Sequence, residues 1–150
     1  MQKITITALI IMLAVAGCTK KDETQTTSAP AATTASTGGG DIGVGPITSL
    51  TLEADLKADL VKQGTDIFAA KCAACHKVGE RYVGPDIKGV TERRKPEWIM
   101  NMILNPQEMT QKDPVAQELL GEYMTQMTFQ NVTQDEARAI LEYFRSIDKK

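Results

Sequence analysis

The segment Cys72-Ala73-Ala74-Cys75-His76 constrains what this chain can fold into more than any other feature. Two thiols three residues apart, followed at once by an imidazole, form the C-x-x-C-H pattern of c-type haem attachment. The thiols add across the two vinyl groups on one edge of the porphyrin, and the adjacent imidazole reaches the iron as an axial ligand. We therefore expect one covalently bound haem c, held by Cys72 and Cys75, with His76 on the iron.

Three other interpretations of the two cysteines are less favoured. A zinc site needs four ligands, whereas the chain has a single histidine and only one further cysteine, Cys18. A thioredoxin-like redox pair belongs to a βαβ pattern, which the sequence does not show. A disulfide between Cys72 and Cys75 closes too small a loop to contribute much stability.

The first residues indicate export and a lipid anchor. The apolar stretch at 4–16 is too short to span a bilayer and has the length of a signal-peptide core. The segment VAGC at 15–18 resembles the lipobox of bacterial lipoproteins, which implies that residues 1–17 are removed and that Cys18 is lipidated. An ordinary signal peptide is the alternative. We expect the mature chain on the periplasmic side of a bacterial membrane, outer or inner, where c-type haem is attached.

Composition separates a linker from a globular part. Residues 24–40 contain no large apolar side chain and cannot bury enough surface to offset the entropy of ordering. We therefore expect a flexible linker after the lipidated cysteine, over 18–48, and one domain over 49–150. The net charge of −2 leaves no broad basic field, which excludes non-specific nucleic-acid binding.

Helix signals recur along the domain, and no period-2 strand pattern does. Thr51 is a candidate N-cap for a first helix, and Asp113 before Pro114 is one for a third. A capping box, Thr133 to Glu136, opens the last helix. The expected helices cover 52–71, 96–105, 114–123 and a segment that begins after Thr133. The domain is therefore predicted to be all-α, with long loops at 72–95 and 124–132.

With these features, the region from about residue 50 to the last residue resembles the class I monohaem cytochromes c, over about two-thirds of the chain. The resemblance implies a small cytochrome c fold, with helices packed around one covalently attached haem. Gly64 and Phe68 match a glycine and an aromatic residue of the family's first helix. In the family this helix crosses the C-terminal helix closely, which implies contact with Tyr143 or Phe144 here.

Two further site residues are implied by the same resemblance. Gly84-Pro85 matches the family's Gly-Pro after the haem motif, where the proline carbonyl accepts a hydrogen bond from the proximal histidine. That bond implies a partner for His76, and it fixes the imidazole and raises its basicity. Met127 stands a few residues before a hydrophobic residue, a Thr cap and the C-terminal helix, as the ligand methionine does in the family. The proline that often follows that methionine is absent.

The other methionines of the mature chain are weaker ligand candidates. Met124 is the main alternative to Met127, and Met109 is a further one, because both lie in or beside predicted loops. Met100 and Met102 lie within a predicted helix with apolar neighbours, and we expect them to pack in the core.

Ligation by one imidazole and one thioether raises the reduction potential and leaves no open position on the iron. We therefore expect a monomeric one-electron carrier, not an enzyme, with a quinol-oxidising complex as donor and a periplasmic reductase or terminal oxidase as acceptor. One alternative is a haem-based ligand sensor or peroxidase-like enzyme with an open axial site. Another is a permanently docked haem subunit of a reductase or oxidase.

Charge near the haem motif suggests a docking face. Seven basic and three acidic residues lie in 71–95. This segment is expected either to surround the haem edge and attract an acidic partner, or to be an ordinary solvated loop. Arg81, Arg94 and Trp98 are candidate partners of the haem propionates, through charge or the indole N–H.

Overall fold

The computed structural model describes residues 41–149, which contain six α-helices and no strand. The predicted all-α fold is thereby confirmed. The predicted signal peptide, Cys18 and the predicted linker as far as residue 40 lie outside the described residues. The helices are α1 (Ala58–Lys71), α2 (Val90–Arg93), α3 (Pro96–Leu104), α4 (Pro106–Lys112), α5 (Pro114–Tyr123) and α6 (Gln134–Asp148).

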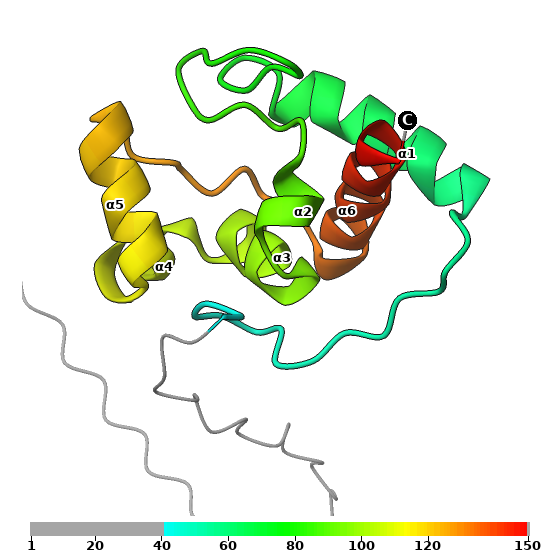
Figure 1. Ribbon diagram of the computed structural model, residues 1–150, viewed down its shortest axis with the longest axis horizontal. Helices are drawn as coiled ribbons and strands as arrows, with labels where there is room; N and C mark the ends of the chain where they lie inside the picture. Colours follow the sequence, from blue (N-terminus) through cyan, green and yellow to red (C-terminus); the bar gives the residue numbers. More distant parts are fainter. Residues whose placement is uncertain (1–40, 150) are drawn as a thin grey trace, which may run out of the picture. The chain divides into compact units, whose positions relative to one another are not determined.

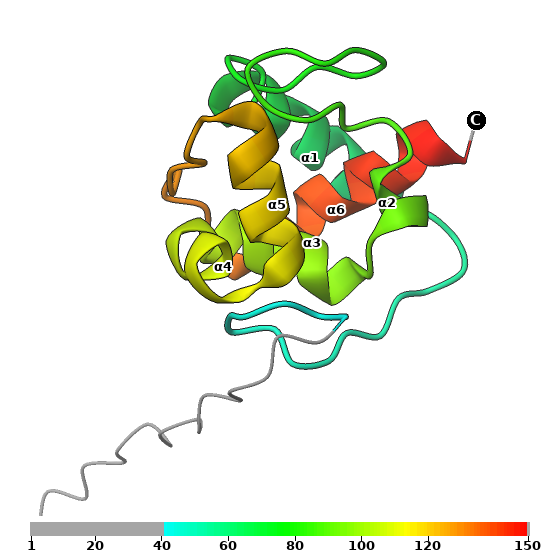
Figure 2. The ribbon, with the colours of Figure 1, turned by 60° about the vertical axis from the view of Figure 1, so that its left-hand side comes forward.

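The close pairing of α1 with α6 is the centre of the fold (Figures 1 and 2). Gly64 makes the close approach possible, because a Cβ at this position would lie 2.0 Å from the carbonyl oxygen of Ala139. One turn later, the Phe68 ring packs at 5.3 Å from the Tyr143 ring and at 5.8 Å from the Phe144 ring, measured between centroids. The predicted crossing is confirmed, and both candidate aromatic residues take part.

Local capping explains where the later helices begin. The Asp113 side chain accepts a hydrogen bond from the Ala116 N–H and caps α5, whose first residue is Pro114. Thr133 and Glu136 form the predicted capping box at the start of α6. In α3, the predicted start at Pro96 and the end before Pro106 also agree with the structure.

The start of α1 differs from the prediction. The helix begins at Ala58, and its N-cap is Lys57, not Thr51. Arg145 of α6 and Lys149, the C-cap of that helix, hold the preceding carbonyls: Arg145 donates to Glu53 O at 2.6 Å and Lys149 donates to Ala54 O at 2.6 Å. The apolar spacing of the segment before α1 therefore reflects packing along an extended chain rather than a helix.

Two helices were not expected. Pro106 ends α3 and also serves as the first residue of α4, so a residue predicted only as a terminator opens the next helix. This places Met109 inside a helix and wholly buried, whereas it was predicted to lie in or beside a loop. The other unexpected helix, α2, is a single turn within the long loop after the haem motif.

The packed part of the chain begins earlier than the predicted boundary at residue 49. In Figures 1 and 2 the segment before α1 passes along the outside of α3. The buried Asn101 amide group of α3 holds it, donating to Ile42 O and Ile47 O at 2.9 Å each and accepting from Ile47 N at 2.9 Å. Ile47 is 4% exposed and belongs to the core. No helix within residues 41–149 is long and apolar enough to cross a membrane.

Candidate cofactor site

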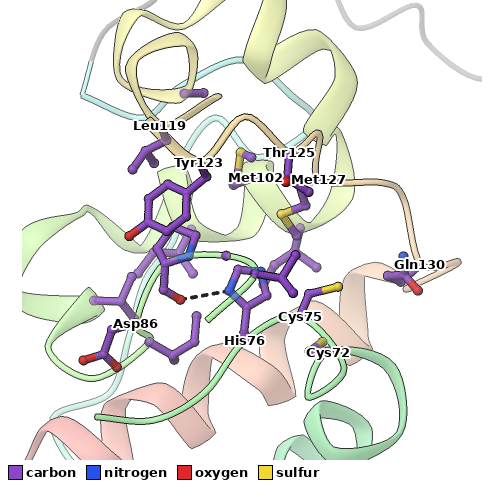
Figure 3. Close-up of a pocket in the computed structure, with 18 of the residues that line it drawn as sticks. Cys72, Cys75, His76, Asp86, Met102, Leu119, Tyr123, Thr125, Met127 and Gln130 are labelled. Carbon is purple, nitrogen blue, oxygen red and sulfur yellow. Dashed lines mark hydrogen bonds between the residues drawn. The ribbon is translucent and has the colours of Figure 1, made fainter. Parts of the chain in front are cut away.

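One apolar cavity of about 210 Å³ lies between the helices and the two long loops. Figure 3 shows side chains from several elements converging on it. Its walls come from all six helices and from the segments around 72–87 and 125–130. Representative apolar lining residues are Phe68, Ile99, Ile103, Leu119, Ile140 and Phe144.

Both cysteines of the motif lie at this cavity. Helix α1 ends at Lys71, and the chain then turns so that the N–H groups of Cys75 and His76 each donate to Cys72 O at 3.0 Å. Both thiols are free; Cys72 is half-buried and Cys75 is exposed. Burial raises the pKa of the Cys72 thiol. Residues 41–149 contain no group of three or more His, Cys, Asp or Glu side chains that could hold a metal ion.

His76 has a fixed orientation. Its Nδ1 lies 3.0 Å from Pro85 O, and because a carbonyl only accepts, Nδ1 carries the proton and donates. The hydrogen bond predicted from Gly84-Pro85 is therefore present, and it leaves Nε2 as the lone-pair nitrogen (Figure 3). Gly84 packs against the imidazole ring, since a Cβ there would lie 2.5 Å from Cε1 of His76.

The structure separates the three methionines considered as ligands. Met127 is half-buried and lines the cavity. Met124 ends α5 in the left-handed conformation, is 85% exposed and is not part of the cavity wall. Met109 is wholly buried outside the cavity, and its sulfur accepts a hydrogen bond from Val44 N at 3.0 Å.

The two methionines of α3 differ from each other. Met100 is 1% exposed and packs in the core as expected. Met102, predicted to pack in the same way, instead lines the cavity while also touching the core. In Figure 3 the side chains of Met102 and Met127 lie on the side of the cavity away from His76. The sequence does not show which of the two methionines faces the cavity, because both have apolar neighbours in α3.

The predicted propionate partners are only partly at the site. The Trp98 ring lines the cavity, but its indole N–H donates to the buried Asp113 carboxylate at 3.1 Å. The prediction that this N–H serves a propionate stays a prediction, and in this structure the N–H already has a partner. Arg81 pairs with Glu122 at 2.6 Å and does not line the cavity.

Two adjacent arginines do reach the cavity wall. Arg94 lies there with its guanidinium 5.4 Å from the centre of the Trp98 ring. Arg93 lies beside it, and the sequence analysis had not selected it. Its guanidinium donates to the carbonyls of Lys88 and Asp86, which orders the loop before α2.

Several charges of the basic segment 71–95 are neutralised within the chain. Lys71 pairs with Glu136 at 3.1 Å, and Lys95 pairs with Asp41 at 2.8 Å. Together with the Arg81 pair, these contacts occupy three of the seven basic side chains. The field available for attracting an acidic partner is therefore weaker than the local charge count indicates.

These residues fit a covalently attached haem. Two free thiols stand at one edge of an apolar cavity, and an imidazole with its Nδ1 already engaged faces the interior. The apolar walls suit the porphyrin faces, and Arg93 and Arg94 supply positive charge at the wall. Within residues 41–149, no buried side-chain nitrogen or oxygen lacks a hydrogen-bond partner. No unsatisfied polar side chain is therefore buried at the cavity.

Comparison with known proteins agrees with this fit. A family model described as cytochrome c matches residues 61–148. A relative named cytochrome c-553-like, from Synechocystis sp., is 37% identical over 67 residues, which cover 43% of this chain and 63% of the relative. The chain thus spans less than two thirds of that relative's length.

Solved structures match over a longer region. A cytochrome c from Rhodothermus marinus is 43% identical with a TM-score of 0.69, covering 70% of this chain and 90% of that one. An engineered form of the Rhodothermus protein, bound to a carbene intermediate, is 40% identical with a TM-score of 0.67, covering 71% of this chain and 92% of that one.

Proposed function

The chain belongs to the cytochrome c family and its cofactor is covalently bound haem c, and from this premise we propose that it is a one-electron carrier. When bound, the haem would supply one-electron chemistry, through the ferrous and ferric states of its iron. In this proposal Cys72 and Cys75 form the two thioether bonds, while His76 and Met127 are the axial ligands. The observation that carries it is the placement of His76 and Met127 at one apolar cavity, with Met127 on the side away from His76 (Figure 3).

The residues around the ligands favour electron transfer with little rearrangement. Pro85 O holds the imidazole through Nδ1, which fixes the ring and raises its basicity. A thioether is a soft ligand that favours ferrous iron and raises the potential. With both axial positions occupied, no position is left for a substrate on the iron.

The context of the carrier is proposed as well. We assign the mature chain to the periplasmic side of a bacterial membrane, anchored through lipidated Cys18, and acting as a monomer. Its donor is a quinol-oxidising complex, and its acceptor is a periplasmic reductase or terminal oxidase. Support for this context comes from the apolar segment at 4–16 and the lipobox-like VAGC at 15–18.

A second candidate function is a ligand sensor or peroxidase-like enzyme with an open axial position. One observation favours it: the segment that carries Met127 has no secondary structure from 124 to 133. If Met127 leaves the iron readily, small molecules gain access. A permanently docked haem subunit has no specific support among residues 41–149.

Optical spectroscopy and potentiometry of the purified holoprotein test the ligation. We expect the ferric protein to show the weak band at the red end of the visible spectrum that reports iron–sulfur bonding. Met127→Ala should shift this band and lower the reduction potential. Met124→Ala, the matched control, should change neither, because its side chain is 85% exposed.

Two results contradict the proposal. A change of the iron–sulfur band in Met124→Ala but not in Met127→Ala would reassign the ligand. Ready binding of carbon monoxide by the ferrous wild-type protein would instead favour the open-site function.

A further inference from the structure

The cavity presents two thioethers, and the proposed function uses only one of them. Of the five methionines within residues 41–149, Met102 and Met127 line the cavity. They come from separate elements, α3 and the segment after α5, and Figure 3 shows both away from His76. The other three are buried outside the cavity or exposed, as described above.

The segment that carries Met127 is weakly held. Across residues 125–132, no backbone N–H donates a hydrogen bond to any group in the described part of the chain. Its long-range hydrogen bonds come from side chains: Gln126 donates to Thr110 Oγ1 at 2.8 Å, and Lys71 donates to Asn131 O at 3.1 Å. Such a segment opens at a small cost compared with global unfolding.

The element that carries Met102 is firmly held. Its neighbours Ile99, Met100 and Ile103 are all buried, and α3 packs against α6. Opening of the segment 125–132 therefore leaves Met102 at the cavity wall. Met102 is half-buried, and no hydrogen bond to its sulfur is found within residues 41–149. Methionine is unbranched, so its thioether explores the space that a departing neighbour vacates.

We propose that Met102 is a reserve axial ligand, which takes the place of Met127 when the segment 125–132 opens. This inference rests on the proposed ligation by Met127. In the exchange, the bond from Met127 sulfur to the iron breaks and a bond from Met102 sulfur forms, while no electron or proton is transferred. Thioether ligation is kept, so the iron stays closed to small ligands while the segment is open.

Three variants of the holoprotein test the inference: Met127→Ala, Met102→Leu and the double variant. Leucine keeps the approximate volume of methionine and removes the sulfur. The readouts are the iron–sulfur band of the ferric form and the carbon-monoxide affinity of the ferrous form. NMR of protein labelled with ¹³C in the methionine methyl groups identifies the bound side chain. Met124→Ala is the control, and circular dichroism verifies the helix content of each variant.

The reserve role predicts a specific pattern. Met127→Ala retains iron–sulfur bonding through Met102, Met102→Leu retains it through Met127, and only the double variant loses it. If Met102 occupies the iron in about nine molecules of ten, the double variant binds carbon monoxide about tenfold more tightly than Met127→Ala.

Other outcomes overturn the inference in distinguishable ways. Loss of the iron–sulfur band in Met127→Ala removes the reserve role and leaves the Met127 ligation intact. Loss of the band in Met102→Leu alone, or its survival in the double variant, contradicts the Met127 ligation and the reserve role together.

A second measurement applies if Met127→Ala does not accumulate as holoprotein. Mild guanidinium chloride opens weakly held segments before the protein unfolds globally. Under these conditions the wild type should keep its iron–sulfur band through Met102, whereas Met102→Leu should lose it. Loss of the band at the same denaturant concentration in both proteins would overturn the reserve role.

Discussion

The two segments that supply the proposed axial ligands are built differently. The segment 72–89, which carries His76, is held by backbone hydrogen bonds, including Gly84 N to Cys75 O at 2.8 Å and Ile87 N to Lys77 O at 3.0 Å. The segment 125–132, which carries Met127, is held by side-chain hydrogen bonds from Gln126 and Lys71 and, at its end, by Val132, which is buried in the core. The histidine side is therefore rigid by construction, whereas the methionine side is attached at a few points.

This difference separates two requirements of a haem site. Covalent attachment and the histidine have to stay in place throughout the life of the protein, and a dense backbone network secures them. The sixth ligand sets the potential and the accessibility of the iron, and a weakly held segment lets small changes in sequence or conditions adjust both. The predictions below test this division of roles.

Hydrogen exchange of the holoprotein should show the largest contrast. The donating amides of Cys75, His76, Gly84 and Ile87 should exchange only through extensive unfolding, whereas amides across 125–132 lack hydrogen-bond acceptors within residues 41–149. We expect protection factors to differ by about three orders of magnitude or more, since local opening costs far less than global unfolding. Similar protection of the two segments would remove the contrast.

Gly84→Ala should damage the histidine side. The added Cβ would lie 2.5 Å from Cε1 of His76 and would push the ring away from its hydrogen bond with Pro85. We expect the free energy of unfolding to fall by about 1–3 kcal/mol, measured by guanidinium chloride titration of the holoprotein. The reduction potential should shift as well.

Gly121→Ala is the matched control for that substitution. No atom lies within 4 Å of the position of its added Cβ, and the residue lies within α5. Alanine there should raise stability by about 0.5–1 kcal/mol, because it favours helix. Equal effects of the two alanines would show that the contact with His76 is not a constraint.

Gln126→Ala should loosen the methionine side. The variant loses the hydrogen bond to Thr110, which costs about 1 kcal/mol. The population with an open segment should then rise roughly fivefold, and with it the carbon-monoxide affinity of the ferrous holoprotein. Gln107→Ala, on an exposed position of α4, should leave this affinity unchanged. A rise in both variants would point to a general loss of stability.

Acid should loosen the segment 125–132 through Glu136. This carboxylate pairs with Lys71, whose ammonium group also donates to Asn131 O in that segment. Hydrogen bonds from the Thr133 N–H and the Lys71 ammonium group hold the pKa of Glu136 below its ordinary value. The stabilisation by this carboxylate is complete above the ordinary glutamate pKa and is lost as the pH falls through the lowered folded value. We therefore expect the carbon-monoxide affinity of the ferrous holoprotein to rise in a step in the acid range, because the segment 125–132 opens more often there.

Glu136→Gln isolates that effect. Glutamine retains an acceptor for the Thr133 N–H but has no titrating charge to pair with Lys71. The acid step should shrink in this variant and persist in Glu118→Gln, whose side chain lies on an exposed position of α5. A step that survives in Glu136→Gln would assign the acid response to other groups.

Short-range signals predicted much of this fold. The capping box at Thr133, the Asp113 cap and the prolines at helix starts located α3, α5 and α6, because these signals act within one turn of the chain. Two misjudgements also concern local rules. Pro106 opens a helix as well as ending one, and the apolar spacing before α1 belongs to an extended segment.

Contacts between distant residues account for most of the remaining differences. Asn101 binds the segment 42–47, which composition assigns to a linker. The Trp98 indole N–H donates to Asp113 and Arg81 pairs with Glu122, and the sequence analysis predicted neither contact. The haem-attachment motif at 72–76 predicted one wall of the cavity. The position of Met102 on another wall depends on how α3 packs, which the sequence alone does not show.

The bare α-carbon of Gly64 has a consequence beyond the local contact. It lets α1 pack against α6, and these two helices lie on either side of the attachment motif in the chain. Closing this helix pair therefore brings the two ends of the domain together around Cys72 and Cys75. A larger side chain at position 64 would hold α1 and α6 apart and leave the motif at the end of a helix without its partner.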